Sequence, residues 1–240
     1  MRFVRHHAQR QWGDCIGAAE RCTRIRLRWP EVVEAPTEAS RESITAFAQA
    51  VLLTPQEGGA PLSDVDTVMA RFIDAYRAFA RAVPNAASTP WRFDRTIEPL
   101  GDTLGVVCLA VTETRALGGA HPNSQTRFTN FALQSGRVVR RGDLLRPDSV
   151  GPLDALGERA FRRVRKMSPQ QDLKAAGFWF PGDHFHLNDN VGVTPTGLVF
   201  FFNDYEVGPH SLGATSLALP WHEVAPFVRP DGPLGSAARW

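Results

Sequence analysis

The sequence predicts an α+β fold, in which an antiparallel sheet is flanked by helices. Two long segments place apolar residues at the 3.6-residue spacing of amphipathic helices, and several shorter ones alternate polar and apolar residues with a period of two. The order is strand, helices, strands, helix, strands, helix, so the two kinds of element are grouped rather than strictly alternating. The 240 residues suffice for one large domain or two small ones.

The first part of the chain is predicted to hold a strand and two helices. A loosely structured N-terminal arm covers residues 1–22, and a half-buried strand follows from Thr23 to Trp29, with Pro30 ending it. On that strand Arg24, Arg26 and Arg28 share one face, which solvent exposure explains most simply.

Helical spacing then extends over residues 40–52 and, more clearly, over 65–83. Ser63 or Asp64 can cap the second helix, and its apolar stripe is typical of a core-facing surface.

The pattern changes to a period of two after residue 90, and a turn with Gly136 at its permissive position joins two of the resulting elements. The predicted elements are strands at 91–99, 103–114 and 124–133, a short strand and tight turn at 138–147, a helix at 151–176 broken around Pro169, a hairpin of 182–193 with 197–203, a strand at 214–220, a helix at 221–228 and a frayed tail at 229–240.

Composition excludes several functional classes. The net charge is only +2, so the sequence does not favour a nucleic-acid partner, and the densest basic run, Arg162 to Lys166, is typical of a solvated helix face. No run approaches the roughly 20 apolar residues that cross a membrane. No signal segment is visible; we expect an exported protein whose signal lies outside this sequence, although a cytosolic origin fits equally.

The three cysteines have different expected roles. Cys15 and Cys22 lie seven apart in a polar segment, which favours a disulfide and an oxidising compartment; a zinc site is disfavoured because no second Cys/His pair follows. Cys108 lies in the apolar run LGVVCLAV and is predicted to be a small buried hydrophobe.

Three stretches together resemble one known family. They are TRIRLRWPEV (23–32), GGAHPNSQTRFTNFALQSGRVVRRGDLL (118–145) and TPTGLVFFFNDYEVGPHSLGATSLALPW (194–221). They resemble the extracellular-domain family of the anti-sigma factor RsiV, whose module also precedes the catalytic domain of the peptidoglycan deacetylase PdaC. The resemblance covers roughly residues 22–228, and the chain departs from it at Asp204 and His210, where the family usually has proline and tyrosine.

The resemblance implies an exported module of two parts, here residues 23–140 and 141–228, that binds lysozyme. In that family the partner-facing surface lies around two loops, which correspond here to Gly118–Ser124 and Asn203–Gly213. We expect these two loops to lie side by side. Two glycines in the first loop let another chain approach closely. The predicted partner-binding residues are Gly118, Gly119, His121, Asn123, Ser124, Tyr205, Glu206, Pro209 and His210. Structural roles are the alternative: His121 bonding across to the second loop, and Tyr205 as a core aromatic.

Two enzymatic interpretations have weaker support in the sequence. Asp204 and Glu206 are two residues apart, so on an extended segment their carboxylates would share one face. Glycosidases need two carboxylates on either side of the bond that they cleave. Any exposed strand can provide such a pair, so the spacing is weak evidence. His184 and His186 would share a strand face and might be joined as metal ligands by Asp183 or His210, yet further ligands at recognisable spacing are lacking.

The sequence therefore predicts a non-catalytic module with no cofactor and no metal that recognises a lysozyme-like muramidase or another cell-wall hydrolase, as an inhibitor, immunity factor or sensor. It would be periplasmic or lipid-anchored in the outer membrane. Direct binding of peptidoglycan or another glycan is the alternative, which exposed tryptophans at 12, 91, 179 or 221 would favour. A metal-dependent hydrolase using His184 and His186 is a third possibility.

Overall fold

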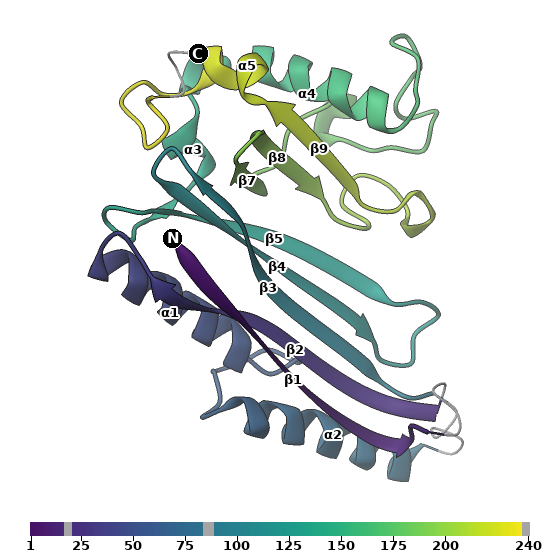
Figure 1. Ribbon diagram of the computed structural model, residues 1–240. Coiled ribbons are helices and arrows are strands. Elements are labelled where there is room, and N and C mark those ends of the chain that lie inside the picture. Colours follow the sequence, from purple (N-terminus) through teal and green to yellow (C-terminus); the bar gives the residue numbers. More distant parts are fainter. Residues whose placement is uncertain (17–20, 84–88, 237–240) are drawn as a thin grey trace. The chain divides into compact units, whose positions relative to one another are not determined.

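The structure is a computed structural model that describes residues 1–16, 21–83 and 89–236. Its strands are β1 (Arg2–Asp14), β2 (Arg21–Glu34), β3 (Arg92–Thr103), β4 (Val106–Ala116), β5 (Asn123–Ala132), β6 (Val138–Val139), β7 (Val191–Thr194), β8 (Gly197–Phe202) and β9 (Thr215–Pro220). Its α-helices are α1 (Glu38–Leu53), α2 (Val65–Ala82), α3 (Arg141–Leu144), α4 (Val150–Val164) and α5 (Trp221–Val224) (Figure 1). The predicted α+β class is confirmed.

Six strands form one sheet in the order β1-β2-β3-β4-β5-β6, and β7-β8-β9 form a second. The larger sheet is not antiparallel throughout, because β2 and β3 run parallel, with Arg24 opposite Arg92. The helices α1 and α2 lie between these strands in the sequence, and such a crossover returns the chain to the end from which it left.

Contacts divide the chain into two compact units. The first comprises Met1–Ala35, Arg41–Glu98 and Val111–Gln125; the second comprises Pro36–Ser40, Pro99–Ala110 and the chain from Thr126 onward. Strands β3, β4 and β5 therefore contribute residues to both units. The division at residue 140 stays a prediction.

In the first unit, α2 packs on β1 and β2. The side chain of Asp64 caps this helix by accepting a 2.7 Å hydrogen bond from the backbone N–H of Thr67, as the sequence predicts. The helix buries Phe72, whose ring lies 6.1 Å from that of Phe93 on β3. The apolar stripe is therefore core.

In the second unit, α4 packs on β9 of the three-stranded antiparallel sheet. Four phenylalanine rings surround that of Phe161 on α4 at centroid distances of 4.9–6.3 Å, coming from Phe178, Phe180, Phe185 and Phe202. Such edge-to-face clusters contribute beyond their buried area.

The N-terminal segment is not a loose arm. Arg2 to Asp14 form β1, which pairs antiparallel with β2 over its whole length. The side chains of His6, Ala8 and Arg10 are half-buried, and those between them are exposed. Because both faces carry mainly polar residues, this alternation does not show as a hydrophobic pattern in the sequence.

Pro30 does not end β2 as predicted, because the strand continues to Glu34 and Pro30 lies opposite Arg5 of β1. Its pairing with β3 reaches only Arg28. Beyond that residue β2 pairs with β1 alone among the described strands, and the missing N–H of a proline is tolerated on the unpaired side.

Three further predictions about the second half were wrong in extent. Helix α4 stops at Val164 rather than extending to 176, residues 184–190 precede β7 instead of forming a strand, and Leu234 in the predicted frayed tail is fully buried. The remaining predicted tail residues, 237–240, lie outside the described residues. Backbone hydrogen bonds from Gly232 to Arg229 and from Gly235 to Gly232 fold residues 229–235 into successive turns.

The structure confirms the disulfide between Cys15 and Cys22 and the burial of Cys108. Burial raises the pKa of the Cys108 thiol to about 12. We expect protein made in an oxidising compartment to show one alkylatable thiol, Cys108, after denaturation without reductant. Intact-mass analysis before and after reduction measures this, and three labelled thiols without reductant would contradict the pairing.

Candidate binding surface

The loop between β8 and β9, residues 203–213, belongs to the second unit and carries an exposed tyrosine stacked on a half-buried histidine. The side chain of Tyr205 is 52% exposed, so it is not a core aromatic. Its ring stacks on that of His210 at 5.6 Å between centroids and 26° between planes. The Tyr205 backbone has φ +66°, a conformation uncommon for a bulky residue, which is often associated with functional turns.

The acidic residues of this loop hold it in shape. The carboxylate of Glu206 accepts hydrogen bonds from the backbone N–H of Asn203 at 2.8 Å and from the side-chain amide of Asn188 at 2.6 Å. Asp204 is 12% exposed and lies 3.6 Å from His210. The positive φ between them means that Asp204 and Glu206 do not lie on an extended segment, so the predicted shared strand face is wrong.

Trp179 adds a second exposed aromatic beside the loop. Its backbone N–H donates to the carbonyl of Val207 at 3.0 Å and its indole N–H donates to the carbonyl of Glu206 at 3.2 Å. The indole ring remains 48% exposed. We call Trp179, Tyr205 and His210 the aromatic surface; the sequence singled out Trp179 only as a glycan candidate, because its link to the loop is tertiary.

Arg165 fixes the far end of the loop, although the sequence placed it on a solvated helix face. Its guanidinium donates to the carbonyls of Leu212 at 2.5 Å and Gly213 at 2.7 Å, and it lies 5.3 Å from the Phe178 ring centroid. Burial lowers the pKa of Arg165. The loop is thus anchored at both ends, which reduces the ordering cost of binding.

The other predicted loop, Gly118–Ser124, belongs to the first unit. Gly118 has φ +91°, which explains why glycine suits this position. His121 is exposed and hydrogen-bonds through Nδ1 with the carbonyl of Pro122 at 3.0 Å, while Ser124 bonds Thr114 at 2.8 Å. Because the two loops belong to different units, a surface shared by both stays a prediction.

Pro209 and Gly119 are exposed in their respective loops, as is Asn123. An added Cβ on Gly119 would have its nearest described neighbour at 4.0 Å, so no clash requires glycine there and its partner-binding role stays a prediction.

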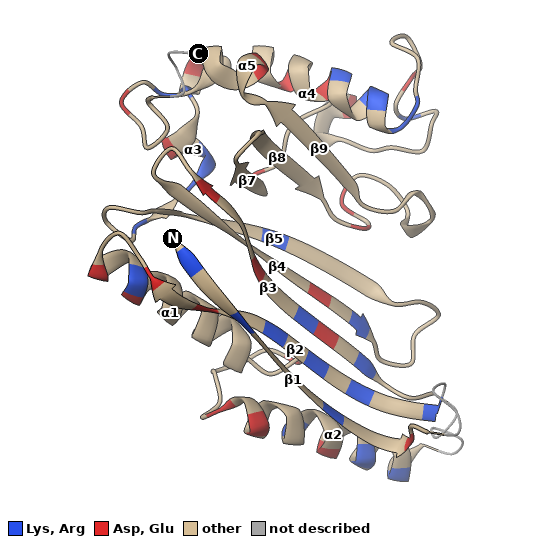
Figure 2. Cartoon of the chain, in the orientation of Figure 1, with Lys and Arg blue, Asp and Glu red and all other residues tan. Residues whose placement is uncertain are grey.

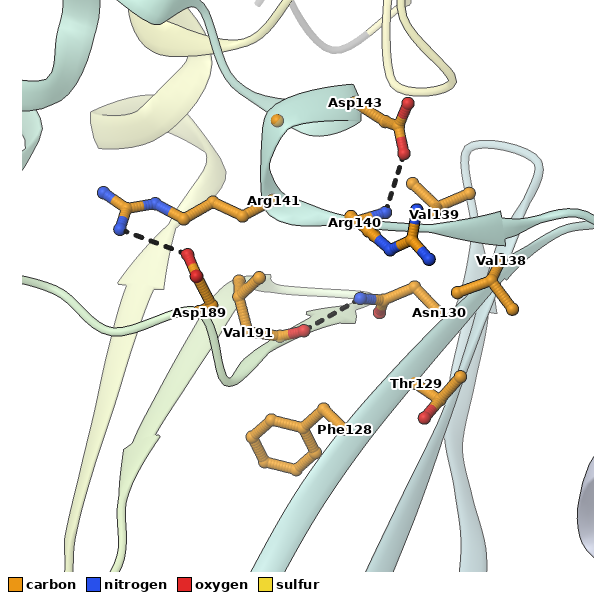
Figure 3. A pocket seen from close by; sticks show the side chains of 11 residues that line it. Phe128, Thr129, Asn130, Val138, Val139, Arg140, Arg141, Asp143, Asp189 and Val191 are labelled. Atoms are coloured by element: carbon orange, nitrogen blue, oxygen red, sulfur yellow. Dashed lines mark hydrogen bonds and ion pairs between the residues drawn. The ribbon is translucent and has the colours of Figure 1, made fainter. Parts of the chain in front are cut away.

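A hollow of about 560 Å³ lies in the second unit between β5, β6, α3 and the segment before β7 (Figure 3). Arg141 points across it, donating to the carbonyl of Leu187 at 2.7 Å with Asp189 at 3.7 Å. The pKa of Asp143 is lowered, mainly because its carboxylate accepts a hydrogen bond from the backbone N–H of Arg140. These polar groups hold the walls together, and Asp143 is an anion rather than a proton donor at neutral pH.

Asn130 crosses the same hollow and joins β5 to β7. Its side-chain amide donates to the carbonyl of Val191 at 2.8 Å and accepts from the backbone N–H of Val193 at 2.8 Å. Asn190 and Asn203 likewise bond the backbone of β5 at Phe128 and Thr126. Asn130 thus pairs with the backbone of β7, whereas Asn190 and Asn203 pair with the backbone of β5.

His184 and His186, the two histidines of the disfavoured metal-site alternative, lie outside any strand. His186 contacts Asp154 at 3.1 Å, and His184 lines a separate hollow of about 590 Å³. Across residues 1–16, 21–83 and 89–236, no three His, Cys, Asp or Glu side chains are grouped as ligands of a metal ion. The absence of a structural metal stays a prediction. No helix in these ranges is long and apolar enough to span a membrane.

The arrangement defines an α+β protein with a six-stranded and a three-stranded sheet, and the candidate site is an exposed loop. Residues 142–222, which include α4, the smaller sheet and the aromatic loop, match the family described as "Protein of unknown function (DUF3298)". This is the family of the RsiV-like module, which agrees with the sequence resemblance at that level.

Two solved structures share the fold. A DUF3298 family member from Bacteroides fragilis aligns with a TM-score of 0.75 and 14% identity over 100% of this chain and 98% of its own. A DUF3298 family protein from Pseudomonas aeruginosa aligns with a TM-score of 0.66 and 18% identity over 95% and 94%. No curated protein sequence matches the chain significantly.

Proposed function

We propose that the protein is an exported, non-catalytic binding module that recognises a lysozyme-like muramidase or another cell-wall hydrolase. The observation that carries the proposal is the exposed ring of Tyr205, stacked on the half-buried His210 and held on a loop anchored at both ends. Tyrosine offers large contact area at low entropic cost and is enriched among interface hot spots. The resemblance to the RsiV-like module supplies the class of partner, and the disulfide suits an oxidising compartment.

Charge favours a neutral or acidic hydrolase as the partner. The chain carries a net charge of +2, so long-range attraction would not help it capture a strongly basic animal lysozyme. Titration calorimetry against one basic lysozyme and a set of neutral or acidic bacterial muramidases tests the proposal. Binding of none of these enzymes, and inhibition of none, would contradict it.

Truncating the aromatic pair gives the residue-level test. We expect Tyr205→Ala and His210→Ala each to weaken binding of the captured hydrolase by about 1–3 kcal/mol, as hot-spot truncations do. Thermal unfolding should change little. His222→Ala, which removes an exposed imidazole of α5 in the same unit, is the matched control and should leave the affinity unchanged. If Tyr205→Ala unfolds the domain while a folded His210→Ala variant binds normally, the loop is structural and the partner surface lies elsewhere.

Glycan binding is the second candidate, and the exposed indole of Trp179 beside Tyr205 favours it. Soluble peptidoglycan fragments distinguish the two. Fragment binding that Trp179→Ala abolishes, without any hydrolase binding, would replace the first proposal with the second.

A further inference from the structure

One face of the first unit's sheet concentrates positive charge. Arg24, Arg26 and Arg28 alternate with buried residues along β2, so they share the face opposite the one that buries Ile25 and Leu27. Figure 2 shows the resulting stripe of basic positions along β2. The parallel register then places Arg92 of β3 beside Arg24. We call these four residues the arginine face.

The surroundings of the arginine face are polar. From Arg24 to Arg28, the residues opposite on β1 are Gln11, Gln9 and His7, and those on β3 are Arg92, Asp94 and Thr96. Asp94 is the one acid among these register partners, and none of them is Phe, Tyr or Trp.

Arg24 and Arg26 share a single carboxylate. Asp94 bonds Arg26 directly, whereas Arg24 reaches the same carboxylate only at 4.0 Å. The Nε of Arg24 is buried and has no hydrogen-bond acceptor among the described residues. Burial first, and then repulsion from Arg26, Arg92 and Arg28, lower the pKa of Arg24 despite the attraction of Asp94. Crowding these charges destabilises the isolated fold, and a bound anion would relieve it.

We propose that the arginine face binds a linear phosphate polymer. Guanidinium groups pair with phosphate oxygens in two-pronged hydrogen bonds. Successive arginines of β2 are about 6.8 Å apart and the neighbouring strand lies about 4.8 Å away, so the array matches a chain of repeated anions better than a single ion. This site lies in the first unit and is independent of the aromatic surface.

Two other classes of anionic partner fit less well. Protein interfaces are usually anchored by aromatic side chains, and single-stranded nucleic acids are bound by stacking bases on such rings. The register partners of the arginine face supply no such ring. A polymer bound through its phosphate groups, without stacked bases or an aromatic anchor, fits the face better.

Long-chain inorganic polyphosphate is the probe, titrated against the full chain at several salt concentrations. The logarithm of the binding constant should fall with the logarithm of salt concentration with a slope of about −2 to −3, as expected for three to four neutralised phosphates. Arg24→Gln/Arg28→Gln should bind at least about tenfold more weakly at low salt and with a shallower slope. Arg159→Gln/Arg163→Gln, which removes two exposed arginines of α4, is the charge-matched control and should bind as the wild type does.

Stability gives an independent measurement. Without ligand, Arg24→Gln should melt at a higher temperature than the wild type, because it removes the crowded charge; with polyphosphate the order should reverse. The proposal is overturned if both double variants lose equal affinity, if polyphosphate does not bind at low salt, or if polyglutamate or single-stranded DNA of matched charge binds more tightly. Tyr205→Ala should bind polyphosphate normally, so failure of this proposal is distinct from failure of the proposed function.

Discussion

Glu113→Gln should lower the free energy of unfolding by about 3–5 kcal/mol, because it leaves a buried arginine without its counter-charge. Arg95 and Glu113 are 2% and 5% exposed, and their side chains meet at 2.6 Å. Arg95 also donates to the carbonyls of Val51 at 2.8 Å and Thr54 at 2.6 Å, so it satisfies the end of α1. Chemical denaturation at neutral pH measures the loss.

The loss should shrink in acid. Burial alone would raise the pKa of Glu113, but Arg95 and Arg115 overcome it and lower the pKa below the ordinary 4.5. A carboxyl with a lowered folded-state pKa contributes stability that is complete above the unfolded value and is lost as pH falls through the folded value. The difference between wild type and Glu113→Gln should therefore be constant above about pH 4.5 and decrease below it.

Two controls separate the ion pair from general effects of charge. Glu42→Gln removes an exposed carboxylate of α1 and should change stability by less than about 0.5 kcal/mol. Arg95→Met/Glu113→Leu removes both charges and should recover part of the loss, because it avoids the buried unpaired arginine but leaves the carbonyls of Val51 and Thr54 without that donor. A loss in Glu113→Gln no larger than that of Glu42→Gln would show that the pair does not support the fold.

Asn130→Ala should destabilise the protein by roughly 2–5 kcal/mol, because it leaves two buried backbone groups without partners. The side chain is 3% exposed and bonds the carbonyl of Val191 and the N–H of Val193, both of which are buried. Hydrogen exchange should show loss of protection at Val193 before most other amides of the second unit.

Asn123→Ala is the matched control, since Asn123 is exposed at the start of the same strand. It should change stability by less than about 0.5 kcal/mol. Equal effects of the two substitutions would mean that the bonds between β5 and β7 contribute little.

Periodicity in the sequence predicted the elements whose burial is one-sided. The apolar stripe of α2 and the alternation of β2, β3 and β9 predict a face that packs on the core, and Asp64 predicts the N-terminal cap of α2. The same rules missed β1, whose half-buried face includes His6 and Arg10, and ended β2 at Pro30, since a proline is tolerated where a strand is paired on one side. They also could not show that β2 and β3 run parallel.

The candidate sites were less visible, because their defining contacts join distant residues. The motif predicted the loop of Tyr205 and His210, but nothing in the sequence places Trp179 against Glu206 or Arg165 against Leu212. The alternation of β2 placed three arginines of the arginine face together, but Arg92 joins them only through the register of β2 with β3, and the burial of the Arg24 Nε is also tertiary. Asn130 looked like an ordinary strand residue.

The two units are interleaved in the sequence, which affects how the chain can fold while it is being synthesised. The first unit is complete in sequence once Gln125 has been made, whereas Pro99–Ala110 belong to the second and must wait for the residues from Thr126 onward. During synthesis the apolar run Val106–Ala110, fully or nearly fully buried in the finished protein, is therefore without its later neighbours. An exposed apolar run of this kind is prone to aggregate. We therefore expect the nascent chain to need a chaperone most after Ala110 has been made and before the residues from Thr126 onward follow.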